Sequence, residues 1–243
     1  MYVLYKKELS NFFSSLTGYL AIIVFLVLTG LFVWVFPGDF NILQNGFANI
    51  DGLFIIAPWV FLFLIPAVTM RLFSEEKKTG TIELLFTKPI NDFQIVAAKY
   101  FAGLTVVIIS LLPTLMYFLS VYLLGNPVGN IDTGGTWGAF IGLFFLSAIY
   151  VAIGVFASSI TDNQIVSFIL AMLLSFFVYI GFDYISQFGI WGGWAYTIEK
   201  IGISFHYSSI SRGVVDSRDI IYFVSVILLF LYATRLVLES RKW

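Results

Sequence analysis

Side chains that could do chemistry or bind a partner are concentrated in one segment, residues 71–99. It contains the run Arg71-Leu-Phe-Ser-Glu-Glu-Lys-Lys-Thr-Gly-Thr-Ile-Glu-Leu-Leu, in which charged groups flank a short apolar stretch. An apolar centre with a charged rim is typical of a surface that docks on another protein. The alternative is a solvated connector whose apolar residues rest on lipid, and the residue pattern by itself leaves both interpretations open.

No motif for catalysis accompanies this segment. The chain has no G-x-x-x-x-G-K-[ST] loop to hold the phosphates of ATP, and neither G-x-S-x-G nor H-E-x-x-H occurs. It contains no cysteine, and its single histidine, His206, excludes a multi-histidine metal site. We therefore expect no enzymatic activity and no cofactor or metal bound by this chain. His206 is expected to have a structural or interfacial role.

Composition makes lipid the solvent of this protein. Of its 243 residues, 60% are hydrophobic and 11% are charged, compared with about 45–50% and about 25% in soluble domains. Six apolar stretches are long enough to cross a bilayer core, which needs about 20 residues per helix. The sequence therefore predicts an all-α membrane protein with six transmembrane helices, at residues 18–36, 52–70, 100–124, 136–158, 164–182 and 220–238.

The predicted spans also restrict the mechanism. Five contain no Asp, Glu, Lys or Arg, and the sixth contains only Arg235, near its end. Proton- and ion-coupled carriers use ionisable residues inside the membrane. A secondary carrier is therefore disfavoured, and so is an intramembrane hydrolase.

Basic residues are unequally divided between the two sides of the membrane. With the N-terminus inside, ten of the 13 Lys and Arg residues fall on the inner face and three on the outer face. Because an excess of basic residues marks the cytoplasmic side, we expect both termini to be cytoplasmic. The inner set is Lys6, Lys7, Arg71, Lys77, Lys78, Lys88, Lys99, Arg235, Arg241 and Lys242, and the outer set is Lys200, Arg212 and Arg218.

Two further elements are predicted at the membrane surfaces. In residues 1–16 one side of a helical wheel is apolar, formed by Tyr2, Tyr5, Leu9, Phe12, Phe13 and Leu16. This pattern favours an amphipathic helix lying in the inner interface. In the outer segment, residues 183–219, apolar residues recur at helical spacing, at Trp194, Ile198, Ile201 and Phe205. Part of that segment is therefore expected to re-enter the outer interface.

The ends of helices in the cytoplasmic segment can also be predicted. Gly80 is suited to end a helix that continues from the second span, because glycine readily adopts the left-handed conformation at a helix C-terminus. Thr81 can then cap a short helix, residues 82–87. Asn91, with Gln94 three residues later, has the spacing of a capping box, which predicts another helix that runs into the third span.

The run from Arg71 to Leu85, followed by Pro89 and Lys99, resembles the cytoplasmic motif of ABC type-2 exporter permeases. In that family the segment between spans two and three forms a coupling helix, which sits in a cleft of the ATPase subunit. The resemblance extends over the whole chain and implies one permease domain, residues 1–243, in a bacterial inner membrane. Carried over residue by residue, it implies an ATPase-docking region formed by Glu75, Glu76, Thr79, Gly80, Thr81, Ile82, Glu83, Leu84 and Leu85.

The resemblance also implies partners and a mechanism. ATP and Mg would be bound by a separate cytoplasmic ATPase. A second permease subunit would complete the transporter, either another copy or a membrane subunit with a periplasmic domain, and lipid would surround both. Nucleic acid is not expected as a partner. Closure of the ATPases would push the coupling helices and export a substrate along the interface between the permeases.

A later run, from Ser211 to Phe223, resembles permeases of gliding motility within the same family. This likeness keeps a second interpretation open. The chain would then be a membrane anchor that passes ATPase-driven mechanical or regulatory change to envelope proteins without transporting a substrate. The identity of any substrate cannot be inferred from the residues.

Three smaller sets of residues have two interpretations each. Prolines in the spans remove backbone hydrogen bonds and predict either gating hinges or ordinary kinks, at Pro58, Pro66 and Pro113. Glycines at G-x-x-x-G spacing permit close helix approach, within the chain or in a dimer, at Gly134, Gly138 and Gly142. Charges before the last span form local ion pairs or contact an outer partner, at Arg212, Asp216, Arg218 and Asp219.

Overall fold

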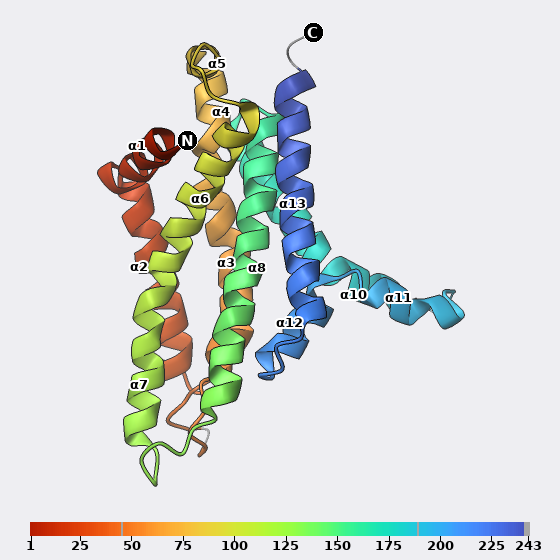
Figure 1. The fold of residues 1–243 in the computed structure, drawn as a ribbon. Helices are drawn as coiled ribbons and strands as arrows, with labels where there is room; N and C mark the ends of the chain where they lie inside the picture. The colour runs from red at the N-terminus through yellow and green to blue at the C-terminus, as the bar shows by residue number, and fades with distance from the viewer. Residues whose placement is uncertain (45, 189, 241–243) are drawn as a thin grey trace.

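A computed structural model describes residues 1–44, 46–188 and 190–240 of the chain, and within these residues the secondary structure is helical, without strands (Figure 1). Six helical segments are long and apolar enough to cross a membrane, which confirms the all-α class and the six predicted spans. Arg241 and Lys242, which were counted among the inner basic residues, lie outside the described residues.

The spans are built from one to three consecutive helices each. They are α2 (Leu16–Gly30) with η1 (Leu31–Val35); α3 (Asp51–Thr69) with α4 (Arg71–Lys78); α6 (Asp92–Leu111), η2 (Leu112–Thr114) and α7 (Leu115–Leu124); α8 (Thr133–Ile160); α9 (Gln164–Phe176), η3 (Phe177–Gly181) and α10 (Phe182–Ser186); and α13 (Ser217–Glu239). The shorter elements are α1 (Tyr2–Ser14), α5 (Thr81–Phe86), η4 (Gly192–Trp194), α11 (Ala195–Glu199) and α12 (Ile203–Ser211).

The N-terminal helix α1 runs across the direction of the spans and packs along α6 (Figure 1). The hydroxyl groups of Tyr5 and Thr105 lie 3.0 Å apart and join the two helices. The residues that α1 buries are Leu4, Glu8 and Phe12, which recur at helical spacing on one face. The apolar side predicted from the sequence therefore differs from the buried face: the two share Phe12, but Leu4 was not part of the predicted side.

The long helix α8 lies at the centre of the bundle and packs against α3, α6, α9, α12 and α13. Small residues let the neighbouring helices approach it closely. A Cβ atom on Gly154 would lie 2.0 Å from the Thr69 hydroxyl oxygen of α3. Since side chains at such a crossing would separate the helices, the glycine sets the distance between α8 and α3.

At its outer end α8 is covered by α12, which folds back against the bundle from the outer segment. A Cβ on Gly138 would lie 2.7 Å from the Gly213 Cα, and one on Gly142 would lie 3.0 Å from the Ile210 Cγ2. Gly134 has only the nearby Asp132 side chain within 4 Å of such a Cβ. Two of the three G-x-x-x-G glycines are therefore packed within the chain.

A hydrogen bond joins α12 to α3 one turn before Pro58. In a regular helix the Phe54 carbonyl would accept a hydrogen bond from the backbone N–H of residue 58, which proline lacks. The Tyr207 hydroxyl of α12 donates to this carbonyl at 2.7 Å. Helix α3 continues through Pro58 and Pro66, whereas Pro113 lies in the 3-10 turn that divides the third span.

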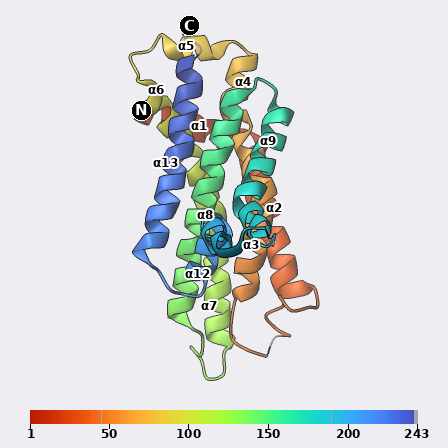
Figure 2. The ribbon, with the colours of Figure 1, turned by 90° about the vertical axis from the view of Figure 1, so that its right-hand side faces the viewer.

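Between Trp194 and Phe205 the outer segment is not one continuous helix. The chain is extended at Gly202, which separates α11 from α12, so the spacing of Trp194, Ile198, Ile201 and Phe205 runs across a break. The residues that α12 buries are Ile203, Tyr207 and Ile210. In contrast, α10 and α11 project sideways from the bundle, as Figures 1 and 2 show together.

Replacing Tyr207 with Phe removes the hydroxyl and leaves the Phe54 carbonyl without its donor. We expect the free energy of unfolding in detergent to fall by about 1 kcal/mol, the usual net contribution of one hydrogen bond. Tyr184→Phe, which removes a hydroxyl from an exposed ring, is the matched control. Equal stability of the two variants would show that the hydrogen bond contributes nothing.

Candidate functional site

The segment that was predicted to be cytoplasmic, residues 71–99, begins with two helices at one end of the bundle. Helix α4 continues α3 beyond Met70, and α5 lies across the end of the bundle (Figure 2). Between them Gly80 has φ +71, the left-handed conformation that was predicted for it. The short helix begins at Thr81 itself, with Gly80 as its N-cap, so Thr81 is one residue inside the helix that it was predicted to cap.

The next helix, α6, begins with the predicted capping box. The Asn91 side chain accepts from the backbone of the third helical residue, and the Gln94 side chain accepts from the Asn91 backbone N–H at 3.3 Å. These bonds satisfy donors that a helix N-terminus otherwise leaves unpaired. The end of the cytoplasmic segment is thus held in one conformation where it enters the third span.

Helix α4 is joined to the inner end of α8 by a serine. The Ser158 hydroxyl accepts hydrogen bonds from the backbone N–H groups of Phe73 at 2.8 Å and Ser74 at 3.1 Å. The same hydroxyl donates to the Met70 carbonyl at 3.0 Å. The break between α3 and α4 is therefore bridged by a side chain of another span, and the Lys77 ammonium adds a bond to the Ser159 carbonyl.

A fully buried lysine lies beneath α4. The Lys99 ammonium is 3.1 Å from a carboxylate oxygen of Glu8 and 2.8 Å from one of Glu76. It also donates to the Leu72 carbonyl at 2.5 Å and lies 5.0 Å from the centre of the Phe73 ring. The Lys99 ammonium of α6 therefore pairs with carboxylates of both α1 and α4.

The surroundings of Lys99 explain how a charge can be buried there. Desolvating an ammonium or carboxylate group costs several kcal/mol, and the cost is offset only when ion pairs and hydrogen bonds complete its shell. Lys99 has two carboxylates and one carbonyl as partners. Losing any one partner would leave the buried ammonium with fewer of the polar groups that offset its desolvation, so the arrangement favours a single position of α4.

Lys7 extends this arrangement to the surface of α1. Its ammonium group lies 3.2 Å from Glu76 and 3.6 Å from Glu8. Partial burial opposes the charged form, but the two carboxylates outweigh it and raise the pKa of Lys7 above its ordinary value. We refer to Lys7, Glu8, Glu76 and Lys99 as the Lys99 cluster.

The residues predicted to dock an ATPase divide into an inward and an outward group. Ile82 is buried, Leu85 is partly buried against the core, and the Glu76 carboxylate belongs to the Lys99 cluster. Leu84 is the exposed apolar residue of α5, with 65% of its surface accessible. The remaining members of the predicted region are exposed, namely Glu75, Thr79, Gly80, Thr81 and Glu83.

Sequence reasoning missed three residues that fix the position of this region: Glu8, Lys99 and Ser158. For Glu8 a signal was present, since a carboxylate lies between Leu4 and Phe12 at the spacing of one helical face. Lys99 was counted as a basic residue on the cytoplasmic side, and a lysine next to a span is usually exposed. For Ser158 no local pattern distinguishes it from other serines in membrane helices.

The outer charged residues do not form one rim. Asp219 is buried and its carboxylate lies 2.7 Å from the His206 Nδ1, whereas the His206 Nε2 is 2.9 Å from the Lys200 carbonyl. Asp216 caps α13 by accepting from the Arg218 backbone N–H. Arg212 donates from Nε to the Ser208 carbonyl. His206 and Asp219 thus join α12 to α13, while the guanidinium groups of Arg212 and Arg218 remain exposed.

Comparison with known proteins gives one family. A family model described as "ABC-2 family transporter protein" matches residues 2–192. The matched residues include α1, the first five spans and the cytoplasmic helices α4 and α5. A search of curated proteins found no match.

Replacing Lys99 with Met keeps a long side chain but leaves Glu8 and Glu76 without their buried cation, with only the half-exposed Lys7 between them. We expect the free energy of unfolding in detergent to fall by about 3–5 kcal/mol, as for other broken buried ion pairs. Adding Glu8→Gln and Glu76→Gln should recover much of the lost stability, because the free-energy effects of mutations at interacting residues are not additive.

Lys78→Met is the matched control, since Lys78 is exposed on α4. We expect this control to leave stability nearly unchanged. A triple variant no more stable than Lys99→Met alone would contradict the assignment of the Lys99 cluster.

Proposed function

The chain belongs to the ABC-2 family of transporter proteins, and on that premise we propose that it couples ATP hydrolysis by a separate ATPase to export of a substrate. Membership makes it the membrane permease subunit of an ABC transporter rather than the catalytic ATPase, and it implies a partner ATP-binding-cassette ATPase. The observation that carries the coupling proposal is the Lys99 cluster, which fixes the cytoplasmic helices on the spans.

In the proposed mechanism the ATPase contacts the exposed face of the cytoplasmic segment. Leu84 supplies the apolar centre and Glu83 part of the charged rim, the arrangement found at interface anchors. ATP and Mg are bound by the ATPase, not by this chain. A displacement of α5 reaches α4 directly, because the two helices are in contact across Gly80.

Two connections support transmission from α4 to the membrane. Ser158 ties α4 to α8, the central span. Glu76 ties it to Lys99 of α6 and, through that ammonium, to Glu8 of α1. Because buried polar groups are costly to separate from their partners, we propose that α4 moves together with α6, α8 and α1 rather than independently of them.

An apolar cavity supports a transport route beside α3. It has a volume of about 470 Å³ and lies between α2, α3 and α9, with Val24, Phe63 and Phe168 in its lining. The first and fifth spans are only 28% and 22% buried, compared with 72% for the second and fourth. We propose that a second permease subunit, identical or carrying a periplasmic domain, covers this side, and that substrate passes between the two subunits.

A finer assignment follows the likeness of residues 211–223 to the gliding-motility permease GldF. On this proposal the transporter acts in gliding motility in the bacterial inner membrane. The alternative function is that of a membrane anchor, in which ATP hydrolysis moves envelope proteins without transport. Flux separates the two: substrate movement by the full complex in proteoliposomes supports export, and ATP hydrolysis without flux supports the anchor.

The proposed orientation has a direct test, because the chain contains no cysteine. Thr87→Cys places a thiol in the cytoplasmic segment, and Val128→Cys places one in the exposed loop between α7 and α8. In intact cells we expect a membrane-impermeant maleimide to label Cys at position 128 only. Labelling at position 87 should require permeabilised cells, and the reverse pattern would exclude a cytoplasmic α5.

The docking proposal is tested with Leu84→Arg and Glu83→Arg in the co-expressed complex. Each places a cation in the proposed interface, and we expect ATPase co-purification to fall about tenfold or more, as for the loss of an interface anchor. ATP-dependent transport should fall with it, while membrane insertion is unchanged.

Asn130→Arg, at an exposed position of the outer loop, is the matched control and should co-purify normally. The chain purified alone should hydrolyse no ATP. Normal co-purification of both α5 variants would remove α5 as the docking element.

A further inference from the structure

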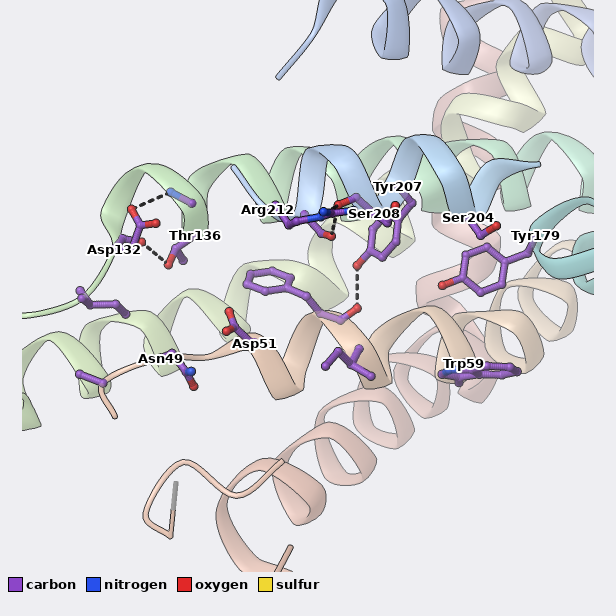
Figure 3. Close-up of a pocket in the computed structure, with 16 residues that line it drawn as sticks. Asn49, Asp51, Trp59, Asp132, Thr136, Tyr179, Ser204, Tyr207, Ser208 and Arg212 are labelled. Atoms are coloured by element: carbon purple, nitrogen blue, oxygen red, sulfur yellow. Dashed lines mark hydrogen bonds between the residues drawn. The ribbon is translucent and has the colours of Figure 1, made fainter. Parts of the chain in front are cut away.

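A second cavity opens near the outer ends of the spans, between α3, α8, α12 and η3 (Figure 3). Its volume is about 590 Å³, which is in the range of ligand pockets in proteins. Asp51, Asp132 and Arg212 lie toward one end of it, and Trp59 and Tyr179 lie toward the other (Figure 3). We call this space the outer cavity.

The charged end of the outer cavity is not neutralised from within the chain. Among the described residues neither Asp51 nor Asp132 takes part in an ion pair, and both residues are exposed. Asp132 Oδ1 accepts a hydrogen bond from the Gly135 backbone N–H at 2.9 Å, which leaves its second carboxylate oxygen for a ligand. Arg212 uses only Nε, which donates to the Ser208 carbonyl at 3.0 Å. Its two terminal nitrogens have no partner among the described residues.

These groups define the ligand chemistry. Both carboxylates line the same end of the cavity and favour a cationic ligand, and an ammonium group supplies three hydrogen-bond donors for their oxygens. The free edge of the Arg212 guanidinium matches the oxygens of a phosphate group. A ligand that carries an ammonium group and a phosphate a short distance apart would satisfy all three side chains.

The opposite end of the outer cavity is apolar and open to the side. Trp59 is joined edge to face with Tyr179, and Ile55 and Trp59 are both exposed on α3. In a membrane the outer part of this face, at Ile55 and Trp59, meets lipid where a second subunit does not cover it, because α3 belongs to a span. An acyl chain can therefore lie along Trp59 while its headgroup occupies the charged end.

We propose that the outer cavity binds a phospholipid with a primary ammonium headgroup, that is, a phosphoethanolamine lipid. The ammonium lies between Asp51 and Asp132, the phosphate pairs with Arg212, and the acyl chain follows Trp59. A choline headgroup lacks N–H donors for the carboxylates, and a glycerol headgroup lacks the cation. Its test uses this chain alone, so the outcome does not depend on whether the assembled complex transports a substrate.

The test is a titration of the purified full chain in detergent, followed by native mass spectrometry. The probes are phosphatidylethanolamine, phosphatidylcholine and phosphatidylglycerol with identical acyl chains, and soluble phosphoethanolamine without chains. We expect the ethanolamine lipid to bind more tightly than the other three probes. Asp51→Asn and Arg212→Gln should each weaken its binding about tenfold or more, as for the loss of a charge-assisted hydrogen bond.

Asp183→Asn and Arg218→Gln make the same chemical changes on the outer side but outside the cavity, and both should bind like the wild type. Equal binding of the three lipids, or equal binding by the cavity variants and their controls, would overturn the proposal. Tighter binding of soluble phosphoethanolamine than of the lipid would overturn the lipid assignment. The comparison of lipids on the wild type decides the question even where a variant does not fold.

Discussion

The burial of one positive charge organises the end of the bundle that carries α1, α4 and α5. Lys99 has no access to water, so its ammonium must be neutralised by groups of the protein. Those groups come from Glu8 of α1, Glu76 of α4 and the Leu72 carbonyl. An element that moved away alone would remove polar partners from a buried charge network. Three segments that are distant in sequence are therefore held in one arrangement, and α5 takes its position from α4.

Helix α8 connects this arrangement to the outer side. At its inner end Ser158 supplies the hydrogen bonds that the break between α3 and α4 leaves open. At its outer end Gly138 and Gly142 admit α12, which also satisfies the carbonyl that Pro58 leaves unpaired. In both places a missing backbone hydrogen bond is replaced by a side chain from another element. This is the solution that a lipid environment requires, because water is not there to serve as the partner.

Features that depend on neighbouring residues were predictable from the sequence. The capping box at Asn91 and Gln94 and the left-handed Gly80 are local geometry, and the structure has both. The ion pairs and hydrogen bonds between distant residues were not predictable in the same way. Glu8 and Lys99 are 91 positions apart, and Phe73 and Ser158 are 85 apart. The partners of Glu76 could therefore be identified only from the fold, although the sequence had indicated its carboxylate as part of the docking region.

By itself the sequence determined that this protein has six membrane spans, because the transfer of a helix into lipid depends on the summed composition of about 20 consecutive residues. It also determined the left-handed turn at Gly80 and the start of α6 at Asn91, since caps and glycine conformations are decided within one helical turn. Only the tertiary structure decided which charges are buried and paired, and which apolar residues of α5 face outward. Those outcomes depend on contacts between separate helices, and no local pattern contains the geometry of their packing.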